Sequence, residues 1–334
     1  MINRFHRRHT LRLLGASLAA GVAPWCVHTQ AQAQAFPSKP IRLIVPHAAG
    51  GNSDAFGRIL AQRLGERLGQ QVVVENRAGA GGTVASAQLT KAAPDGYTLV
   101  VADNGTHAIA PTLYGTRLGY DVFADFTPIT QAALFPNVIL VHPNLPAKTP
   151  VDLVNMAKAQ PGRLTYSSAG TGNGSHLTVE LFRMAAGGLN MVHVPYKGGA
   201  PAIQALLAGD VQMTAVSVNT ALPHIQSGRA RALGLASTKR SPALPDVPTF
   251  AEMGIPFSAD SWLGVVGPPG MPADVVAKLN AEIAASLRAP DVTERLAKLG
   301  LEVVASSPVE LTAVLNRDVP KWGKAVKDSG AVAE

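Results

Sequence analysis

The chain has 334 residues, 47% of them hydrophobic, and a formal net charge of +7 at pH 7. Four of its 29 lysines and arginines lie within residues 1–35, which contain no acidic residue, so the rest carries 25 basic against 22 acidic residues, a net +3. With five tyrosines, three tryptophans and no basic cluster interleaved with aromatics, the composition argues against a nucleic-acid partner.

Residues 1–35 have the pattern of an export signal. Four arginines, at positions 4, 7, 8 and 12, precede a mostly apolar run from Leu13 to Val27, and A-x-A cleavage sites follow at 31–33 and 33–35. We therefore expect cleavage near residues 33–35 and a mature protein in the periplasm. The run 7–12 also fits a twin-arginine pattern loosely, so both the general secretory and the twin-arginine routes stay open.

The same segment contains Cys26, the single cysteine of the chain. Pro24 and Trp25 precede it instead of the small residues of a lipid-attachment motif, which argues against a lipid anchor. The apolar run is shorter than the roughly 20 residues needed to span a bilayer. The mature chain is therefore expected to be soluble, to contain neither disulfide nor thiol chemistry, and to depend on its core for stability.

Residues 41–68 predict a strand, a small-residue turn and a helix. The apolar run Ile41–Val45 leads into a turn, residues 47–54, that contains Gly50 and Gly51 and is followed by a stretch with one apolar and one charged face. Asn52, Ser53 or Asp54 is expected to cap the helix, whose free N–H groups suit a carboxylate or phosphate. An ordinary capped turn that binds nothing is the alternative interpretation of this pattern.

Strand and helix patterns alternate from there onward, which indicates an α/β fold with mostly parallel sheets. Strands are expected at 41–45, 71–75, 98–102, 190–195, 211–218 and 230–236. Helices are expected at 53–68, 81–92, 150–160, 174–186, 200–208 and 219–227. Further helices are expected after Pro272, at 291–299 and at 308–328, with Pro320 interrupting the last one as a kink.

Two proline-punctuated segments, near 127–142 and near 256–269, indicate that the chain leaves a first domain and later returns to it. We therefore predict a discontinuous domain 1, residues 36–136 and 259–334, and a domain 2, residues 137–258. Within domain 2 a second glycine loop, residues 170–175, follows the apolar segment 164–166 and precedes a helix. This repeats the arrangement at 41–68, and two such helix starts would each hold one carboxylate if they faced one cleft.

Segments spread over the whole mature chain resemble the Bug family of periplasmic solute receptors. They run in the expected order: 36–46, 48–51 with Asp54, 73–82, 94–99, Gly170 and Gly172 with His176 and Leu177, 194–198, 221–225 and 240–249. The resemblance implies the extracytoplasmic receptor of a tripartite tricarboxylate-type transporter. Its fold would be a type II-like periplasmic binding protein, in which two α/β domains joined by a double-stranded hinge close over an organic acid.

The resemblance also implies partners and a binding site. The partners would be a mono- or dicarboxylate and the membrane permease subunits, the receptor would be a monomer without a metal or cofactor, and no catalysis is expected. One wall of the site would be the loop 47–54 with residues after the third strand: His47, Ala48, Gly50, Gly51, Asn52, Ser53, Asp54, Asn104 and Thr106. The opposing wall would be Ser168, Gly170, Thr171, Gly172, Asn173, Ser175 and His176, with Tyr196 and Lys197 nearby.

Two departures from the family pattern concern ligand choice. His47 stands where relatives often carry an aromatic residue, and Ala215-Val216-Ser217 stands where many carry Phe-Asp-Asn. Our hypothesis is that His47 adds a donor and that loss of the carboxylate at Val216 disfavours ligands with an ammonium group, because an unpaired buried ammonium is costly. A surface position for His47, and a solvated turn position for Lys197, are the alternatives.

A secreted serine hydrolase is the alternative function. Gly51-Asn52-Ser53-Asp54-Ala55 is one residue short of the nucleophile elbow, which would make Ser53 the nucleophile. Against this, Ser53 follows the first mature strand, too early for the usual hydrolase topology. The ligand's identity, the permease served and a role in sensing stay undetermined at this level.

Overall fold

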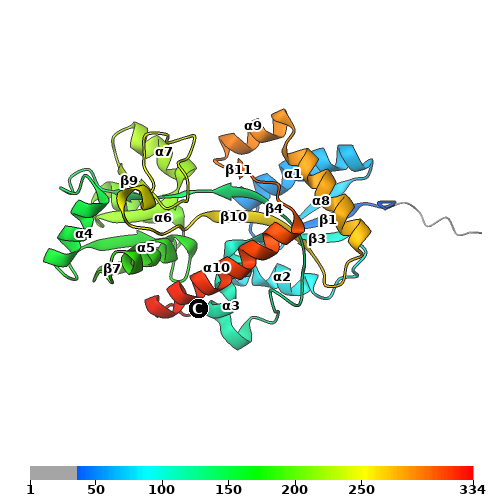
Figure 1. Cartoon of the computed structure of the whole chain (residues 1–334), viewed down its shortest axis with the longest axis horizontal. Helices are drawn as coiled ribbons and strands as arrows, with labels where there is room; N and C mark the ends of the chain where they lie inside the picture. The colour runs from blue at the N-terminus through cyan, green and yellow to red at the C-terminus, as the bar shows by residue number, and fades with distance from the viewer. Residues whose placement is uncertain (1–35, 334) are drawn as a thin grey trace, which may run out of the picture. The chain divides into compact units, whose positions relative to one another are not determined.

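The computed structural model describes residues 36–333, which belong to one compact unit (Figure 1). The expected export signal, its cleavage sites and Cys26 lie outside the described residues. Within them, no helix combines the length and the apolar character needed to cross a membrane. The elements form two sheets, and each sheet with its helices is called a lobe below.

The first lobe contains a six-stranded sheet in the order β11-β4-β10-β3-β1-β2. Its strands are β1 (Ile41–Val45), β2 (Val72–Asn76), β3 (Thr98–Asp103), β4 (Thr127–Phe135), β10 (Ser261–Gly267) and β11 (Glu302–Val303). Its helices are α1 (Asn52–Leu68), α2 (Thr83–Leu89), α3 (Ala110–Tyr114), α8 (Ala273–Leu287), α9 (Pro290–Lys298) and α10 (Pro308–Ser329). Three short turns, η1 (Ala80–Gly82), η2 (Gly105–Ile109, a π-helix) and η3 (Gly115–Arg117), complete it.

Alternation along the strands divides the core of this lobe into two layers. Leu43 and Val101 pack with α1, α8 and α9 on one face of the sheet, whereas Ile44 and Val100 pack with α2 and α10 on the other. Both faces are covered, so β1 and β3 are almost wholly buried apolar runs.

The second lobe contains a five-stranded sheet in the order β7-β6-β8-β5-β9. Its strands are β5 (Asn137–Val141), β6 (Thr165–Ser168), β7 (Val192–Pro195), β8 (Met213–Ser217) and β9 (Arg231–Leu235). Its helices are α4 (Pro150–Ala159), α5 (Gly174–Ala185), α6 (Gly199–Ala208) and α7 (Val218–Gln226), with a short η4 (Ala251–Met253). Helices α4 and α5 cover one face of the sheet, and α6 and α7 cover the other.

Both sheets are mixed rather than mostly parallel. The pairs β1–β2, β1–β3, β6–β7 and β6–β8 are parallel. Every antiparallel pair in the described part of the chain involves β4, β5 or β10. These strands lie in the two proline-punctuated segments where the chain passes between lobes, and such passages supply strands without the crossover helix that parallel pairing requires.

The chain passes between the lobes twice, and the two passages are joined by hydrogen bonds. Pro136 separates β4 from β5, and the return passage leads from β9 to β10. Asn137 Nδ2 donates to the carbonyl of Ala259 at 2.7 Å and to Ser261 Oγ at 3.2 Å. The N–H of Ala236 donates to the carbonyl of Asn137 at 2.8 Å.

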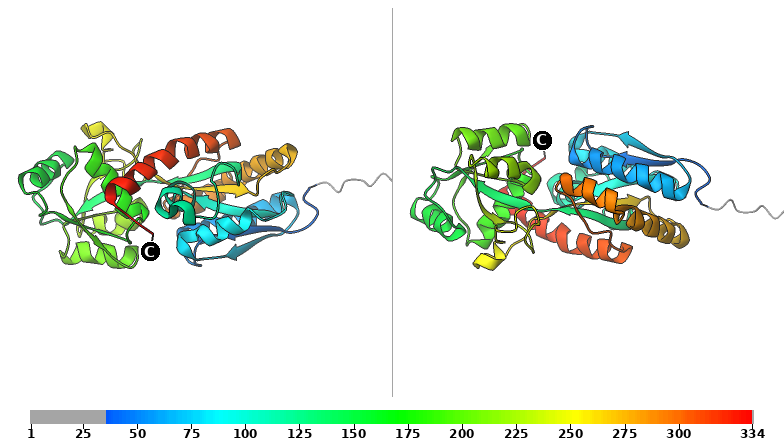
Figure 2. Two further views of the ribbon diagram at one scale, coloured as in Figure 1. Left: turned by 90° about the horizontal axis from the view of Figure 1, so that it is seen from below. Right: turned by 90° about the horizontal axis from the view of Figure 1, so that it is seen from above.

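Helix α10 also links the lobes, as Figures 1 and 2 show. Its last turns carry Trp322, Ala325 and Val326, which pack with Leu177 and Leu181 of α5 in one buried cluster. Helix α10 continues through Pro320 to Ser329. Burial of both flanking turns offsets the one backbone hydrogen bond that proline cannot make.

Candidate functional site

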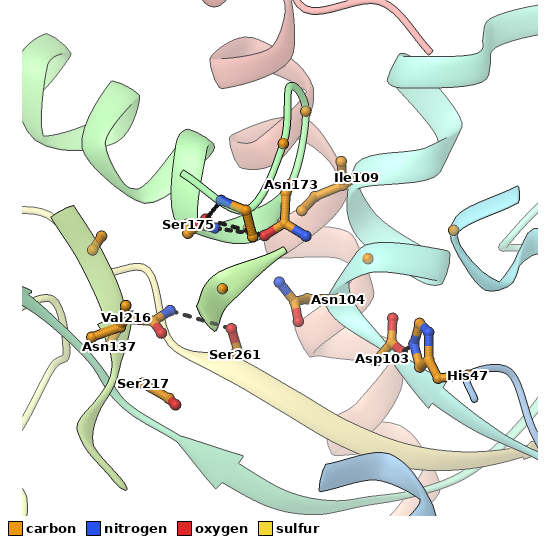
Figure 3. Close-up of a pocket in the computed structure, with 18 of the residues that line it drawn as sticks. His47, Asp103, Asn104, Ile109, Asn137, Asn173, Ser175, Val216, Ser217 and Ser261 are labelled. Atoms are coloured by element: carbon orange, nitrogen blue, oxygen red, sulfur yellow. Dashed lines mark hydrogen bonds and ion pairs between the residues drawn. The ribbon is translucent and has the colours of Figure 1, made fainter. Parts of the chain in front are cut away.

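A pocket of about 570 Å³ lies between the lobes (Figure 3). The first lobe lines it with His47, Ser53, Gly81, Asp103, Asn104, Gly105, Ile109, Ala110, Leu113, Tyr114, Phe135, Ser261 and Leu263. The second lobe lines it with Asn137, Ala169, Gly170, Thr171, Gly172, Asn173, Gly174, Ser175, Gly199, Ala202, Ala215, Val216, Ser217 and Thr220. None of these residues is a lysine or an arginine.

The pocket lies where the carboxyl ends of parallel strands meet the beginnings of the helices that follow them. Ser53 is in the first turn of α1 and Gly105 begins η2, after β1 and β3. Across the pocket, Gly174 begins α5, Gly199 begins α6, and Ser217 immediately precedes α7. Helix N-termini expose unpaired N–H groups and a partial positive charge, so their convergence favours an anion even without a cationic side chain.

The loop before α1 is held by Asp54 rather than capped by a side chain. The N-cap residue is Gly51, and Asp54 Oδ2 accepts the N–H of Gly50 at 2.9 Å. Asp54 Oδ1 accepts from Arg58 Nε and Asn76 Nδ2, both at 3.0 Å. These hydrogen bonds, the Gly50 N–H above all, lower the pKa of the buried carboxyl group. Both oxygens of Asp54 are therefore engaged in fixing the shape of the loop.

The loop before α5 is held by its own polar residues. Asn173 is the N-cap, and its Oδ1 accepts the N–H of Ser175 at 3.0 Å. Ser175 Oγ accepts the N–H of Ala169 at 2.9 Å, which closes the loop onto β6. Gly172 has φ +73° at the tip, where a Cβ would lie 2.8 Å from Leu113 Cδ1 of the first lobe. The left-handed backbone favours glycine there, and any side chain would have to displace the end of Leu113.

Two stacked histidines lie behind this loop. The rings of His176 and His193 are 3.9 Å apart, His176 Nδ1 accepts the N–H of Gly172 at 3.1 Å, and His193 Nε2 lies 2.6 Å from Ser168 Oγ. Burial lowers the pKa of both imidazoles to about 4. They are therefore neutral near pH 7, and His176 supports the loop as an acceptor.

The charges near the histidines are paired with one another. Glu180 accepts two hydrogen bonds from Arg183 Nη1, at 2.6 and 2.8 Å, and one from the hydroxyl of Tyr166. Burial raises the pKa of Tyr166 first, and the neighbouring Glu180 carboxylate raises it further. This network anchors α5 to β6 beneath the pocket.

His47 and Asp103 form the one charged pair among the lining residues. Nε2 of His47 lies 2.6 Å from Oδ2 of Asp103, and the two side chains lie together at the edge of the pocket in Figure 3. Asp103 Oδ1 accepts the N–H of Thr106 at 2.8 Å. The hydrogen bond to Asp103 raises the pKa of His47. Despite burial, the hydrogen bond from His47 lowers the pKa of Asp103.

The structure brings eight of the predicted site residues together in the lining and places ten behind or beside it. Those in the lining are His47, Ser53, Asn104, Gly170, Thr171, Gly172, Asn173 and Ser175. Those outside it are Ala48, Gly50, Gly51, Asn52, Asp54, Thr106, Ser168, His176, Tyr196 and Lys197. Thr106, Ser168 and His176 are buried and make internal hydrogen bonds, Tyr196 packs on the α6–α7 face, and Lys197 is exposed.

Several residues that line the pocket were not among the site residues predicted from the sequence. Ser217 ends β8 and Thr220 lies in the first turn of α7, much as Ser53 lies in the first turn of α1 after β1, so the recurring strand, polar residue and helix pattern would have indicated them. Asn137 and Ser261 lie on the strands that pass between the lobes, where no local pattern marks them. Val216 lines the pocket, so its effect on ligand choice remains open to test.

The chemistry of a serine hydrolase is not assembled around Ser53. His47 is bonded to Asp103, and within residues 36–333 no hydrogen bond joins Ser53 to a histidine. Within the same residues, no group of three or more His, Cys, Asp or Glu side chains is placed to hold a metal ion. Neutral polar side chains line both walls of the pocket.

Two relatives match this chain over almost its full length. A protein encoded in the tcbD–tcbE intergenic region of Pseudomonas sp. strain P51 is 39% identical over 312 residues, 92% of each chain. Protein BugT of Bordetella pertussis is 34% identical over 324 residues, 96% of this chain and 97% of BugT.

Solved structures of the same kind contain bound carboxylates. Rpa4515 of R. palustris with adipate is 34% identical with a TM-score of 0.75, and the match covers 89% of this chain and 99% of Rpa4515. MatC (Rpa3494) of Rhodopseudomonas palustris with bound malate is 34% identical with a TM-score of 0.72, covering 87% and 100%. The family model described as "Tripartite tricarboxylate transporter family receptor" matches residues 56–331. The chain belongs to this family of periplasmic receptors.

Proposed function

We propose that this protein is an extracytoplasmic receptor that captures a small organic carboxylate between its lobes and delivers it to a tripartite tricarboxylate-type permease. The pocket carries the proposal, because helix beginnings converge on it from both lobes and no lysine or arginine lines it. A carboxylate there is held by N–H groups, hydroxyls and amides. Each helix dipole contributes about 0.3–2 kcal/mol, whereas a micromolar Kd needs about 8 kcal/mol, so hydrogen bonds and burial on closure supply most of the affinity.

The proposed ligand is a mono- or dicarboxylate without an ammonium group. Val216 presents an apolar side chain to the pocket, and the carboxylate of Asp103 is already bonded to His47 and Thr106. A ligand ammonium would find no free carboxylate among the described lining residues. Malate and aspartate differ by a hydroxyl in place of the ammonium, so they form a matched pair for testing this preference.

Capture requires two bodies that move. We propose that residues 36–136 with 259–334 form one body and residues 137–258 the other, with the Asn137 hydrogen bonds at the hinge. The ligand-binding residues proposed from the sequence contribute in two ways: those in the lining touch the ligand, and Asp54, Ser168 and His176 hold the loops. The receptor acts as a monomer in the periplasm, without turnover of its ligand.

The test is calorimetric titration of residues 36–334 after unfolding and refolding to remove bound ligand. The panel contains malate, adipate, succinate, citrate, aromatic acids, aspartate and glutamate. We expect saturable binding of one carboxylate class with a micromolar or lower Kd, and recovery of the ligand unchanged. Malate is expected to bind at least about tenfold more tightly than aspartate, since an unpaired buried ammonium costs more than 1.4 kcal/mol.

Two results would contradict this function. Absence of binding by every carboxylate, in protein that refolds with its native melting temperature, would remove the receptor assignment. Ester hydrolysis that is lost in Ser53→Ala would establish the enzyme instead. Equal affinity for malate and aspartate would refute the ligand preference alone.

A further inference from the structure

The pair formed by His47 and Asp103 has a geometry that a surface histidine would not show. Asp103 is buried, with one oxygen toward His47 at 2.6 Å and the other accepting from the backbone and the hydroxyl of Thr106, at 2.8 and 3.1 Å. A carboxylate only accepts hydrogen bonds, so Nε2 of His47 is the donor. The orientation and tautomer of the imidazole are therefore set by a carboxylate from the next strand of the sheet.

The second ring nitrogen of His47 is available to a ligand. Within the described residues Nε2 is the only atom of this side chain that forms a hydrogen bond, and His47 lines the pocket with 39% of its side chain exposed. With Nε2–H bonded to Asp103, Nδ1 accepts when the ring is neutral and donates when it is protonated. A protonated His47 adds an N⁺–H donor to a lining that otherwise has neutral donors.

We propose that His47 is a specificity-determining residue that makes ligand capture dependent on proton uptake, with Asp103 as its positioning residue. This inference rests on the proposed function, because it concerns a carboxylate in the same pocket. Protonated His47 donates Nε2–H to Asp103 and Nδ1–H to an oxygen of the bound carboxylate. The neutral ring loses that donor and presents a lone pair, which repels the anion.

Charged and polar groups surround His47 on several sides. On the β3 side stands Asp103, whose lowered pKa keeps it ionised, and beyond it His107, whose pKa burial lowers to about 4. Asn76, at the end of β2, donates from Nδ2 to the carbonyl of His47 and to Asp54 of α1. Arg58 of α1 neutralises Asp54. On the α2 side stands Gly82, without charge. Of these groups, His47 is the one imidazole whose pKa is raised above its ordinary value of 6.5.

The His47–Asp103 pair sets the direction in which ligand affinity changes with pH. Asp103 raises the pKa of His47, and a bound carboxylate against Nδ1–H raises it further, so binding takes up protons. Affinity should rise as pH falls through the bound-state pKa and level off below the free-state pKa. We expect malate or adipate to bind about three- to tenfold more tightly at pH 6.5 than at pH 9, the range for a half-exposed charge-assisted hydrogen bond.

The experiment is calorimetric titration of malate and adipate between pH 6 and 9, in paired buffers of different ionisation enthalpy to count protons taken up. If neither probe binds, the carboxylate of the panel that binds most tightly replaces them. Wild-type protein should take up a fraction of a proton per ligand. His47→Gln, which keeps a donor but does not titrate, should show neither proton uptake nor pH dependence.

Two further variants separate this role from a structural one. Asp103→Asn keeps the acceptor for Thr106 and should move the affinity inflection to lower pH, a change that loss of packing does not produce. His142→Gln, at the end of β5 remote from the pocket, should leave the pH profile unchanged. The pKa of His47, followed by NMR through its ring Cε1–H, should rise when ligand saturates the protein.

Binding without proton uptake in the wild type, or the same pH slope in His47→Gln, would overturn the inference and leave the receptor function standing. Absence of binding by the whole carboxylate panel would overturn both. A wild-type pH dependence that disappears in His47→Gln and shifts in Asp103→Asn would establish the pair as the determinant.

Discussion

Gly172, at the tip of the loop before α5, is favoured there both by its backbone conformation and by its neighbour in the other lobe. Its φ of +73° favours glycine, and a side chain there would meet Leu113 across the pocket. Gly187 shares the conformation, with φ +92°, but a Cβ there would have no atom within 4 Å. Comparing substitutions at Gly172 and Gly187 therefore distinguishes the effect of backbone strain from the effect of a clash between the lobes.

We predict that Gly172→Val and Gly187→Val each lose about 1–3 kcal/mol of unfolding free energy from strain, measured in urea. Only Gly172→Val should also lose carboxylate affinity, by about tenfold or more, because the loop cannot approach the first lobe. Adding Leu113→Ala should restore part of that affinity in a double-mutant cycle. Equal loss of affinity in both glycine variants would show that the contact with Leu113 has no role in binding.

At the scale of single residues, sequence patterns located the two glycine loops that border the pocket but did not separate the residues that line it from those that support it. Asp54 and Ser53 are neighbours in one predicted loop, yet Asp54 is buried and bonded to Gly50 while Ser53 lines the pocket. Which side chain faces a ligand depends on the donors around it. For Asp54 these include Asn76, which is 22 positions away in the sequence.

Helix α5 and its glycine loop depend on neutral histidines. Burial lowers the pKa of His176 to about 4, below its ordinary value of 6.5, so the unfolded chain binds a proton that the folded chain does not. Stability therefore falls as pH falls from about 6.5 toward 4. The histidine with a raised pKa, His47, acts in the opposite direction, since its pairing is retained at low pH.

We predict that the free energy of unfolding decreases between pH 7 and pH 5, with His176 contributing at most about 2 kcal/mol of the loss. Urea denaturation at several pH values measures it. His176→Gln retains an acceptor for the Gly172 N–H and should flatten the slope. If its slope equals that of the wild type, the buried His176 is not the source of the pH dependence.

At the scale of elements, the periodic segments were predicted well because their signals are local. Strands β1, β3, β8 and β9 and helices α1, α5 and α7 lie within one or two residues of the expected ranges. The strands β4 and β10 were visible as boundary segments, but their antiparallel pairing was not. Pairing joins Ser261 to Phe135, and no local pattern records such a partner.

The lobes meet on both sides of the pocket in this structure. Gly172 lies against Leu113, Gly300 lies against Asn219, and Lys239 lies 3.4 Å from Glu302. A Cβ on either glycine would lie within 3 Å of a side-chain atom of the other lobe. These contacts join the two lobes, and a carboxylate that touches both walls of the pocket would stabilise the state in which the lobes meet, by its differential affinity for that state.

We predict that a carboxylate at 100 times its Kd stabilises the protein against unfolding by about 2.7 kcal/mol and raises its melting temperature in a concentration-dependent manner. Small-angle scattering of the ligand-stripped protein should show a radius of gyration that decreases on saturation. An unchanged radius with a raised melting temperature would mean that the ligand enters a pocket already closed.

By itself the sequence determined the α/β class, the order of most elements, the two glycine loops and the family, because hydrophobic periodicity, turn residues and motifs act over short stretches of chain. Only the tertiary structure decided the mixed pairing of the sheets, the contribution of Asn137 and Ser261 to the pocket, and the pairing of His47 with Asp103. The last pair is separated by 56 positions. Such contacts arise from how strands lie beside one another, and that arrangement depends on the packing of the whole molecule.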